Sequence, residues 1–187
     1  MSKPAPDPAP ASDAELIEAM NLGHVEAFEE LYQRHRDWVY RLAYRFTGNE
    51  QDALDVLQET FTYLLKRTPK LALWVKLTTF LYPAVKNIAL TLRRKRGRTV
   101  SADGVLEQIA ARPEPPAAEF QHGDLISVLK ALPDSHREVL LMRFVDGMSL
   151  EEIADSLQIP IGTVKSRLHN AVAKLREDRR TRGYFRE

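Results

Sequence analysis

The chain has 187 residues, 44% of them hydrophobic and 28% charged, a composition that allows a globular protein to bury a core. It contains no cysteine, which excludes disulfide scaffolds and thiolate metal sites. No apolar run approaches the roughly 20 residues that a membrane-spanning helix needs, and residues 1–12 lack the apolar core of a signal peptide. We therefore expect a cytoplasmic protein with no membrane insertion.

The net charge of +1 hides a segregation of charge along the chain. Residues 28–98 carry 14 basic and 7 acidic side chains, whereas residues 99–121 carry 1 basic and 4 acidic side chains. Such asymmetry is typical of a basic block with a polyanionic partner, next to an acidic connector.

The N-terminal part of the chain predicts a tail and two helices. Residues 1–11 are rich in proline and alanine without periodicity, which favours disorder. Ser12 and Glu15 form a capping box that starts a short helix, and a long amphipathic helix follows from His24 to Thr47. His35 lies beside the apolar stripe of this helix. We expect it to be buried and hydrogen-bonded, because no cluster of ligating side chains accompanies it.

A third helix, from about Glu50 to Arg67, has an acidic row on one face. Asp52, Asp55 and Glu59 recur there at helical spacing, away from the apolar side. A catalytic carboxylate pair needs two environments that push the pKa values apart, and nothing in the sequence predicts such a cleft. The row favours docking on a basic partner, and an ordinary solvated helix face is the alternative.

A fourth helix, from about Thr78 to Arg96, follows a loop that contains Trp74. Its predicted outward side carries Lys76, Phe80, Lys86, Asn87, Arg93 and Arg94. Basic side chains with interleaved aromatic rings suit single-stranded nucleic acid, although each ring could equally belong to the core. Pro83 is anomalous, because proline inside a helix removes a hydrogen bond and costs about 3 kcal/mol.

Residues 99–121 contain three prolines and four acids, which predicts a flexible linker. We therefore expect an all-α protein of two small helical domains, residues 12–98 and 122–178, whose relative position is free until a partner fixes it. Residues 179–187 are expected to form a frayed tail.

The second domain ends in a predicted helix-turn-helix. Ser149 and Glu152 form a capping box, Gln158-Ile159-Pro160 ends that helix, and another helix runs to Arg176. No acid occurs between Pro160 and Arg176. A helix in a DNA major groove needs donors without acidic repulsion, so this pattern favours DNA binding over a plain packing motif.

Sequence motifs in both domains resemble those of bacterial extracytoplasmic-function sigma factors of the sigma-70 family. The motifs are D-A-L-D-V-L-Q-E-T-F (Asp52 to Phe61) and G-T-V-K-S-R-L (Gly162 to Leu168), within a similarity from Ala27 to Arg176. The resemblance implies a sigma region 2 and a sigma region 4. It implies a promoter-specificity subunit that binds core RNA polymerase and recognises minus-35 and minus-10 elements, without enzymatic activity, cofactor, metal or small-molecule substrate.

The resemblance also implies roles for individual residues. It assigns docking on the clamp of the largest polymerase subunit to Asp52, Asp55, Gln58 and Glu59. It assigns recognition and melting of the minus-10 element to Trp74, Phe80, Lys86, Asn87, Arg93 and Arg94. It assigns contacts to the minus-35 element to Arg143, Thr163, Lys165, Ser166, Arg167, His169 and Asn170. An anti-sigma factor is a further candidate partner.

The chain departs from the family pattern at Phe80, where tryptophan is usual, at Pro83, where a basic residue is usual, and at Gln158, where glycine is common. A left-handed backbone at Gln158 would carry about 1 kcal/mol of strain. A stand-alone dimeric helix-turn-helix regulator is the alternative function, but no sustained heptad predicts a dimerisation helix. No metal-spaced histidine pair, phosphate loop or nucleophile elbow supports an enzyme.

Overall fold

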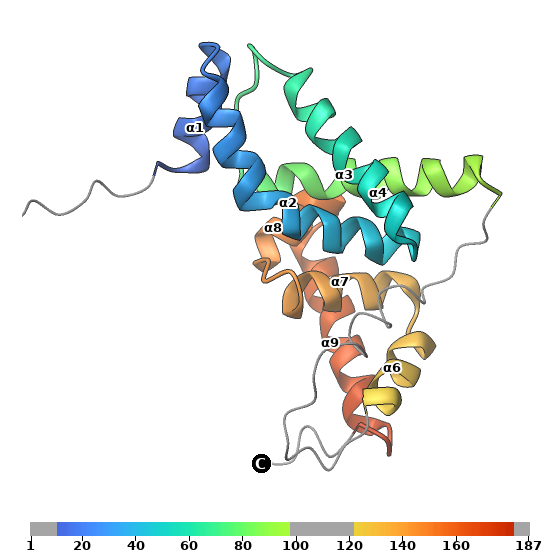
Figure 1. The fold of residues 1–187 in the computed structure, drawn as a ribbon. Helices are drawn as coiled ribbons and strands as arrows, with labels where there is room; N and C mark the ends of the chain where they lie inside the picture. The colour runs from blue at the N-terminus through green and yellow to red at the C-terminus, as the bar shows by residue number, and fades with distance from the viewer. Residues whose placement is uncertain (1–10, 98–121, 182–187) are drawn as a thin grey trace, which may run out of the picture.

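A computed structural model describes residues 11–97 and 122–181 as helices and connecting turns, with no strand in those ranges (Figure 1). The all-α prediction is thus confirmed for the described residues. The expected linker at residues 99–121 lies outside them, as do most of the two expected tails. Within the described ranges, no helix is both long and apolar enough to cross a membrane.

The first unit is a bundle of four helices, α1 to α4. Its core is formed by residues such as Leu31, Val39, Leu42 and Leu81, and α2 packs on both α3 and α4. The helices are α1 (Asp13–Asn21), α2 (Val25–Thr47), α3 (Glu50–Leu65) and α4 (Leu77–Lys95).

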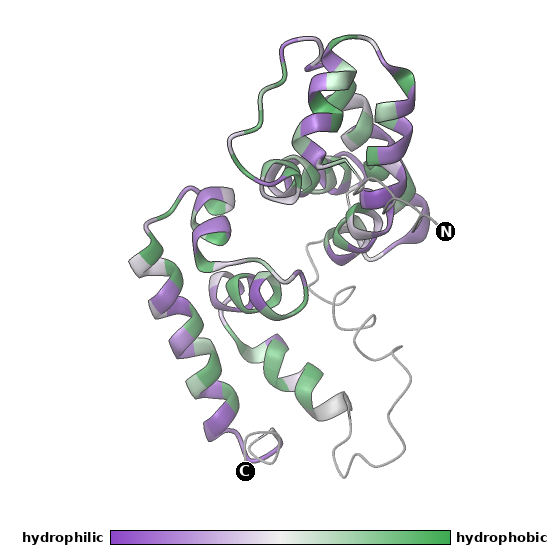
Figure 2. Ribbon diagram, turned by 90° about the vertical axis from the view of Figure 1, so that its left-hand side faces the viewer, coloured by the Kyte–Doolittle hydropathy of each residue, from purple (hydrophilic) through white to green (hydrophobic). Residues whose placement is uncertain are grey.

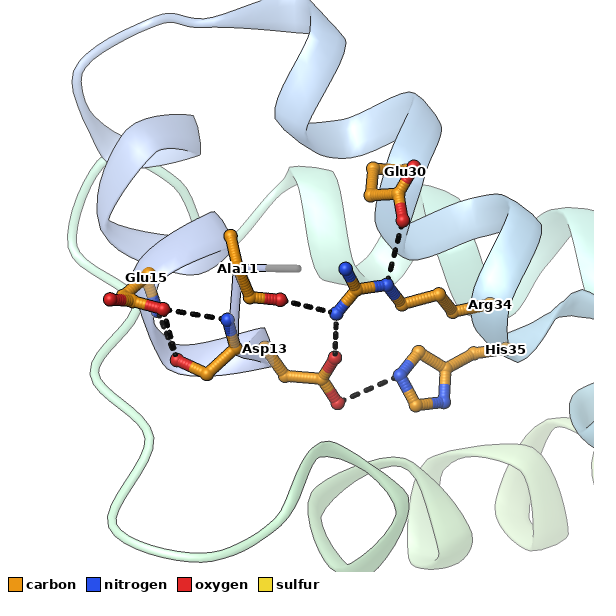
Figure 3. A network of polar contacts seen from close by, with 7 residues as sticks. Ala11, Asp13, Glu15, Glu30, Arg34 and His35 are labelled. Carbon is orange, nitrogen blue, oxygen red and sulfur yellow. Dashed lines mark hydrogen bonds and ion pairs between the residues drawn. The ribbon is translucent and has the colours of Figure 1, made fainter. Parts of the chain in front are cut away.

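Polar contacts fasten the start of α1 to α2 (Figure 3). Ser12 and Glu15 form the expected capping box. Arg34 donates to the carbonyl of Ala11 over 2.6 Å, and His35 Nε2 lies 2.8 Å from Asp13 Oδ2. The ring of His35 is largely buried, so the prediction of a hydrogen-bonded structural histidine is confirmed.

The second unit contains α6 (His122–Ala131), α7 (Asp134–Phe144), α8 (Leu150–Leu157) and α9 (Ile161–Glu177). α7 packs on α9, with Leu140, Leu141 and Leu175 in a shared apolar cluster. The Arg137 guanidinium donates to carbonyls at the end of α6, which satisfies acceptors that the helix itself leaves free. α8 and α9 are the expected helix-turn-helix.

The two units pack against each other. Met142, Met148 and Ile153 of the second unit are buried in the same apolar cluster as the core of the bundle. α4, the last helix of the bundle, contacts α8 of the second unit (Figure 1), and Figure 2 shows the two groups of helices next to each other. The sequence predicted independent units, whereas this structure joins them through a shared core.

The turn between α8 and α9 is left-handed at Gln158, where φ is 53°. Because a left-handed residue with a Cβ is strained, we expect Gln158→Gly to raise the free energy of unfolding by about 1 kcal/mol. Urea unfolding measures this change, and Gln158→Ala is the control because it retains the Cβ. Equal stabilities of the glycine variant and the natural chain would contradict the expectation.

Candidate nucleic-acid interface

Helix α9 presents an exposed face without acidic side chains up to Arg176. Lys165, Ser166, His169 and Asn170 are exposed, while Val164 and the next apolar turns face inward. The capping box of Ser149 and Glu152 starts α8, and the left-handed Gln158 sets the turn into α9. Local structure therefore aims these donors and acceptors away from the core, as the sequence predicted.

The remaining residues predicted for the minus-35 element lie near this face in different environments. Arg143 is exposed, and its Nη1 donates to the carbonyl of Met148 over 2.9 Å, which braces the turn before α8. Thr163 and Arg167 are half-buried. Ser166 Oγ donates to the carbonyl of Thr163 over 3.0 Å, so this hydroxyl is partly engaged by its own helix.

The residues predicted for the minus-10 element are scattered around α4. Trp74, in the loop before α4, is 93% exposed, and Asn87 and Arg94 are exposed as expected. Phe80 is instead half-buried and stacks on Tyr63, with 6.1 Å between ring centroids. Lys86 is half-buried, and its Nζ lies 2.5 Å from Glu138 Oε1 of the second unit.

The placement of Arg93 on the outward basic face is wrong for this conformation. Arg93 is only 4% exposed, and its Nη1 donates to the carbonyl of Phe46 over 2.6 Å. Burial lowers the pKa of Arg93 from its usual value. A guanidinium at the end of α2 satisfies a carbonyl that has no helical donor, so Arg93 stabilises the bundle.

The acidic row on α3 is split between the core and the surface. Asp52 is 0% exposed and pairs with Arg96, so its expected surface position is wrong in this structure. α4 packs on α3, and Arg96 at the end of α4 brings its guanidinium to the Asp52 carboxylate. Asp55 remains partly exposed and lies 2.8 Å from Arg96 Nη2, while Gln58 and Glu59 are exposed.

A groove between α3 and α4 places the acidic row beside the basic helix. Asp55 and Glu59 line it on the α3 side, and Asn87 and Lys95 line it on the α4 side. The surfaces expected for a protein partner and for nucleic acid are therefore neighbours.

Polar contacts between the units were not predicted from the sequence. Arg45 of α2 pairs with Asp146, and both side chains are less than a tenth exposed. Burial raises the pKa of Asp146, and the charge of Arg45 opposes that shift. The one available signal was that Arg45 follows Leu42 at helical spacing on the apolar side of α2.

Comparisons with known families match both units. The sigma-70 region 2 model matches residues 31–99, and the sigma-70 region 4 model matches residues 128–177. The chain is similar to the ECF RNA polymerase sigma factor SigW of Bacillus subtilis, with 31% identity over 184 residues, covering 88% of this chain and 95% of that protein. It is also similar to the RNA polymerase sigma-E factor of Streptomyces coelicolor, with 34% identity over 161 residues, covering 84% and 88%.

The fold is similar to that of a solved structure, CnrH in complex with the cytosolic domain of CnrY. The TM-score is 0.65 at 25% identity, and the match covers 88% of this chain and 94% of CnrH.

Proposed function

Because the chain belongs to the extracytoplasmic-function group of the sigma-70 family of RNA polymerase sigma factors, we propose that its two helical units carry three binding surfaces. As a sigma factor, the chain binds core RNA polymerase and directs transcription initiation at minus-35 and minus-10 promoter elements. Its role is promoter specificity rather than covalent chemistry. We assign these tasks to residues 12–98 and 122–178, and we place the protein in the cytoplasm.

The first surface is the exposed face of α9, and it reads the minus-35 element in the major groove. The observation that supports it best is the run of exposed donors without an acid, including Lys165, His169 and Asn170. An asparagine side chain can pair with both N6 and N7 of adenine, whereas lysine can donate to guanine or to phosphate. Arg143, Thr163, Ser166 and Arg167 border this face and complete the surface.

The second surface joins the loop before α4 to the exposed side of that helix, and it receives the unpaired minus-10 strand. Trp74 offers an exposed indole, on which a base can stack with about 1–3 kcal/mol per base. Asn87 and Arg94 are exposed further along α4 and can contact bases and phosphates. Phe80 supports this surface from its stack with Tyr63.

The third surface is the exposed part of the acidic row, and it docks on a basic region of core polymerase. Asp55, Gln58 and Glu59 supply it. Asp52 acts behind it, since its buried carboxylate holds Arg96 beside Asp55.

An anti-sigma factor is a further partner that we propose, as the family resemblance implies, and the similar protein CnrH was likewise solved in complex with a second protein, the cytosolic domain of CnrY. The relatives named above are sigma factors, which leaves the stand-alone dimeric regulator without support.

Trp74→Ala tests the second surface. We expect promoter melting by the reconstituted holoenzyme to fall about 5-fold to 150-fold, which corresponds to the loss of one stacked base. Stability should be unchanged, because the side chain is almost fully exposed. Permanganate reactivity of unpaired thymines measures the melting. Trp74→Phe is the matched control, since it retains a ring, and equal melting by the alanine variant would contradict the assignment.

A further inference from the structure

Pro83 leaves a backbone acceptor without its helical donor. Proline has no amide hydrogen, so the carbonyl of Thr79, four residues earlier in α4, receives no bond from position 83. Thr79 is 3% exposed, which keeps water from replacing that donor. A buried carbonyl without a partner is unfavourable, so another group is needed beside it.

The second unit supplies that group. Ser156 Oγ donates to the carbonyl of Thr79 over 3.2 Å, and Ser156 is itself buried in α8. The acceptor that Pro83 leaves free in one unit is therefore satisfied by a hydroxyl from the other. Positions 79 and 156 are far apart in the sequence, so this bond forms only when the units are packed.

Charged side chains also join the two units. Arg45 pairs with the buried Asp146, and Lys76 Nζ lies 2.7 Å from the Glu152 carboxylate. Glu138, on α7, accepts two hydrogen bonds from α4 at its Oε1 atom. Lys86 Nζ donates over 2.5 Å, and the Tyr82 hydroxyl donates over 3.0 Å.

The units also share an apolar contact in their common core. Met142, Met148 and Ile153 are each at most 2% exposed. The contact between the units thus combines buried apolar side chains with paired charges.

The packed arrangement is incompatible with binding a whole promoter. As their names state, the minus-35 and minus-10 elements lie about 25 base pairs apart, or roughly 85 Å at about 3.4 Å per base pair. A compact chain of 187 residues has a radius of gyration of about 16 Å, so its width is roughly half the distance between the two elements. Two units that share a core cannot contact both elements, and Lys86 is covered by Glu138.

We propose that Pro83 makes α4 a docking surface for this chain's own α8, and that the chain closes through Thr79 and Ser156 into a resting form that cannot engage both promoter elements. The inference rests on the proposed function. Core polymerase and promoter DNA then favour the open form, because their binding sites require the units to separate.

Zero-length carbodiimide crosslinking of the unmodified full chain tests the closed form directly. We expect mass spectrometry to find Lys86 joined to Glu138 and Lys76 joined to Glu152. Asp146→Asn should lower both yields at least tenfold, because the closed form then buries Arg45 without its counter-charge. Asp178→Asn makes the same change of charge near the C-terminal end of α9 and should leave the yields unchanged. Absence of both crosslinks in the natural chain would overturn the proposal.

A double-mutant cycle tests the role of Pro83. Pro83→Ala restores an amide donor for the Thr79 carbonyl, and Ser156→Ala removes the hydroxyl that now serves it. Each change should lower the crosslinking yield several-fold. Because both act on one acceptor, the double variant should lose less than the product of the two single effects. No effect of either change, or strictly multiplicative effects, would refute the role of Pro83.

A disulfide lock then links closure to function. Thr79→Cys with Ser156→Cys introduces the only thiols of a chain that has no cysteine of its own. We expect oxidation to join them and to lower run-off transcription with core polymerase at least tenfold, and reductant to restore it. Thr79→Cys with Lys174→Cys, which places the second thiol on exposed α9, should not be affected by oxidant.

Equal transcription by the locked and reduced forms would overturn the autoinhibition and leave the sigma function intact. Failure of the unmodified chain to transcribe, despite the expected crosslinks, would instead count against the proposed function while the closed form stands.

Discussion

Replacing Asp55 and Glu59 together by lysine is expected to abolish stable binding to core RNA polymerase while the chain stays folded. Both side chains lie on the outward part of α3, beside the groove with α4. A basic partner surface would then meet two cations in place of two anions, and like-charge contacts across an interface cost several kcal/mol. Gel filtration with purified core polymerase measures the association.

The fold should survive because exposed charges contribute little stability. Asp55 pairs with Arg96 only at the surface, and such a pair is worth about 0–1 kcal/mol. Glu26→Lys with Glu29→Lys is the matched control, because it makes the same charge change at exposed positions of α2. Circular dichroism should be native-like for both variants. Unchanged polymerase binding by the Asp55 and Glu59 variant would show that this row is ordinary solvated surface.

Replacing Lys165 and Asn170 together by alanine is expected to weaken recognition of the minus-35 element by about 1–3 kcal/mol for each base that is no longer hydrogen-bonded. Both residues lie on the exposed face of α9, so neither change should disturb the core. Fluorescence anisotropy of the holoenzyme on duplexes with the natural or a scrambled element measures the drop in discrimination.

Lys174→Ala provides the control for this experiment. Lys174 lies on the same helix near its C-terminal end, where a contact to phosphate would be independent of sequence. Its removal should weaken binding to natural and scrambled duplexes alike. If the Lys165 and Asn170 variant behaves in the same way, those side chains touch phosphate only and do not read bases.

Helix boundaries were the most predictable part of the structure. The capping boxes at Ser12 and Ser149 and the left-handed Gly48 and Gln158 depend on local geometry that neighbouring residues determine. For the same reason the outward face of α9 could be predicted, because a helix in which one face is apolar has only one way to bury it.

Contacts between distant segments could not be predicted in the same way. Asp52 and Arg93 look like surface charges in the sequence, but their burial depends on Arg96 and on the end of α2. Helical periodicity places a residue on a face, but it does not show which other element covers that face. The charges of Arg45 and Asp146 were missed for this reason, since each becomes a core residue only when the units pack.

Pro83 combines a local effect that the sequence predicts with a long-range contact that it does not. The sequence predicts that a proline there leaves a gap in the hydrogen bonds of the helix, and α4 indeed continues through it from Leu77 to Lys95. Only the fold shows that Ser156 fills the gap. A departure from the family pattern therefore gains a structural reason that the sequence of α4 alone does not contain.

The most direct test of the sigma function is gel filtration of the full chain with core polymerase from its own organism, followed by run-off transcription on fragmented genomic DNA. We expect a stable complex that produces specific transcripts absent with core polymerase alone. Failure of the chain to bind core polymerase, together with binding of duplex DNA by the chain alone as a dimer, would contradict the sigma function.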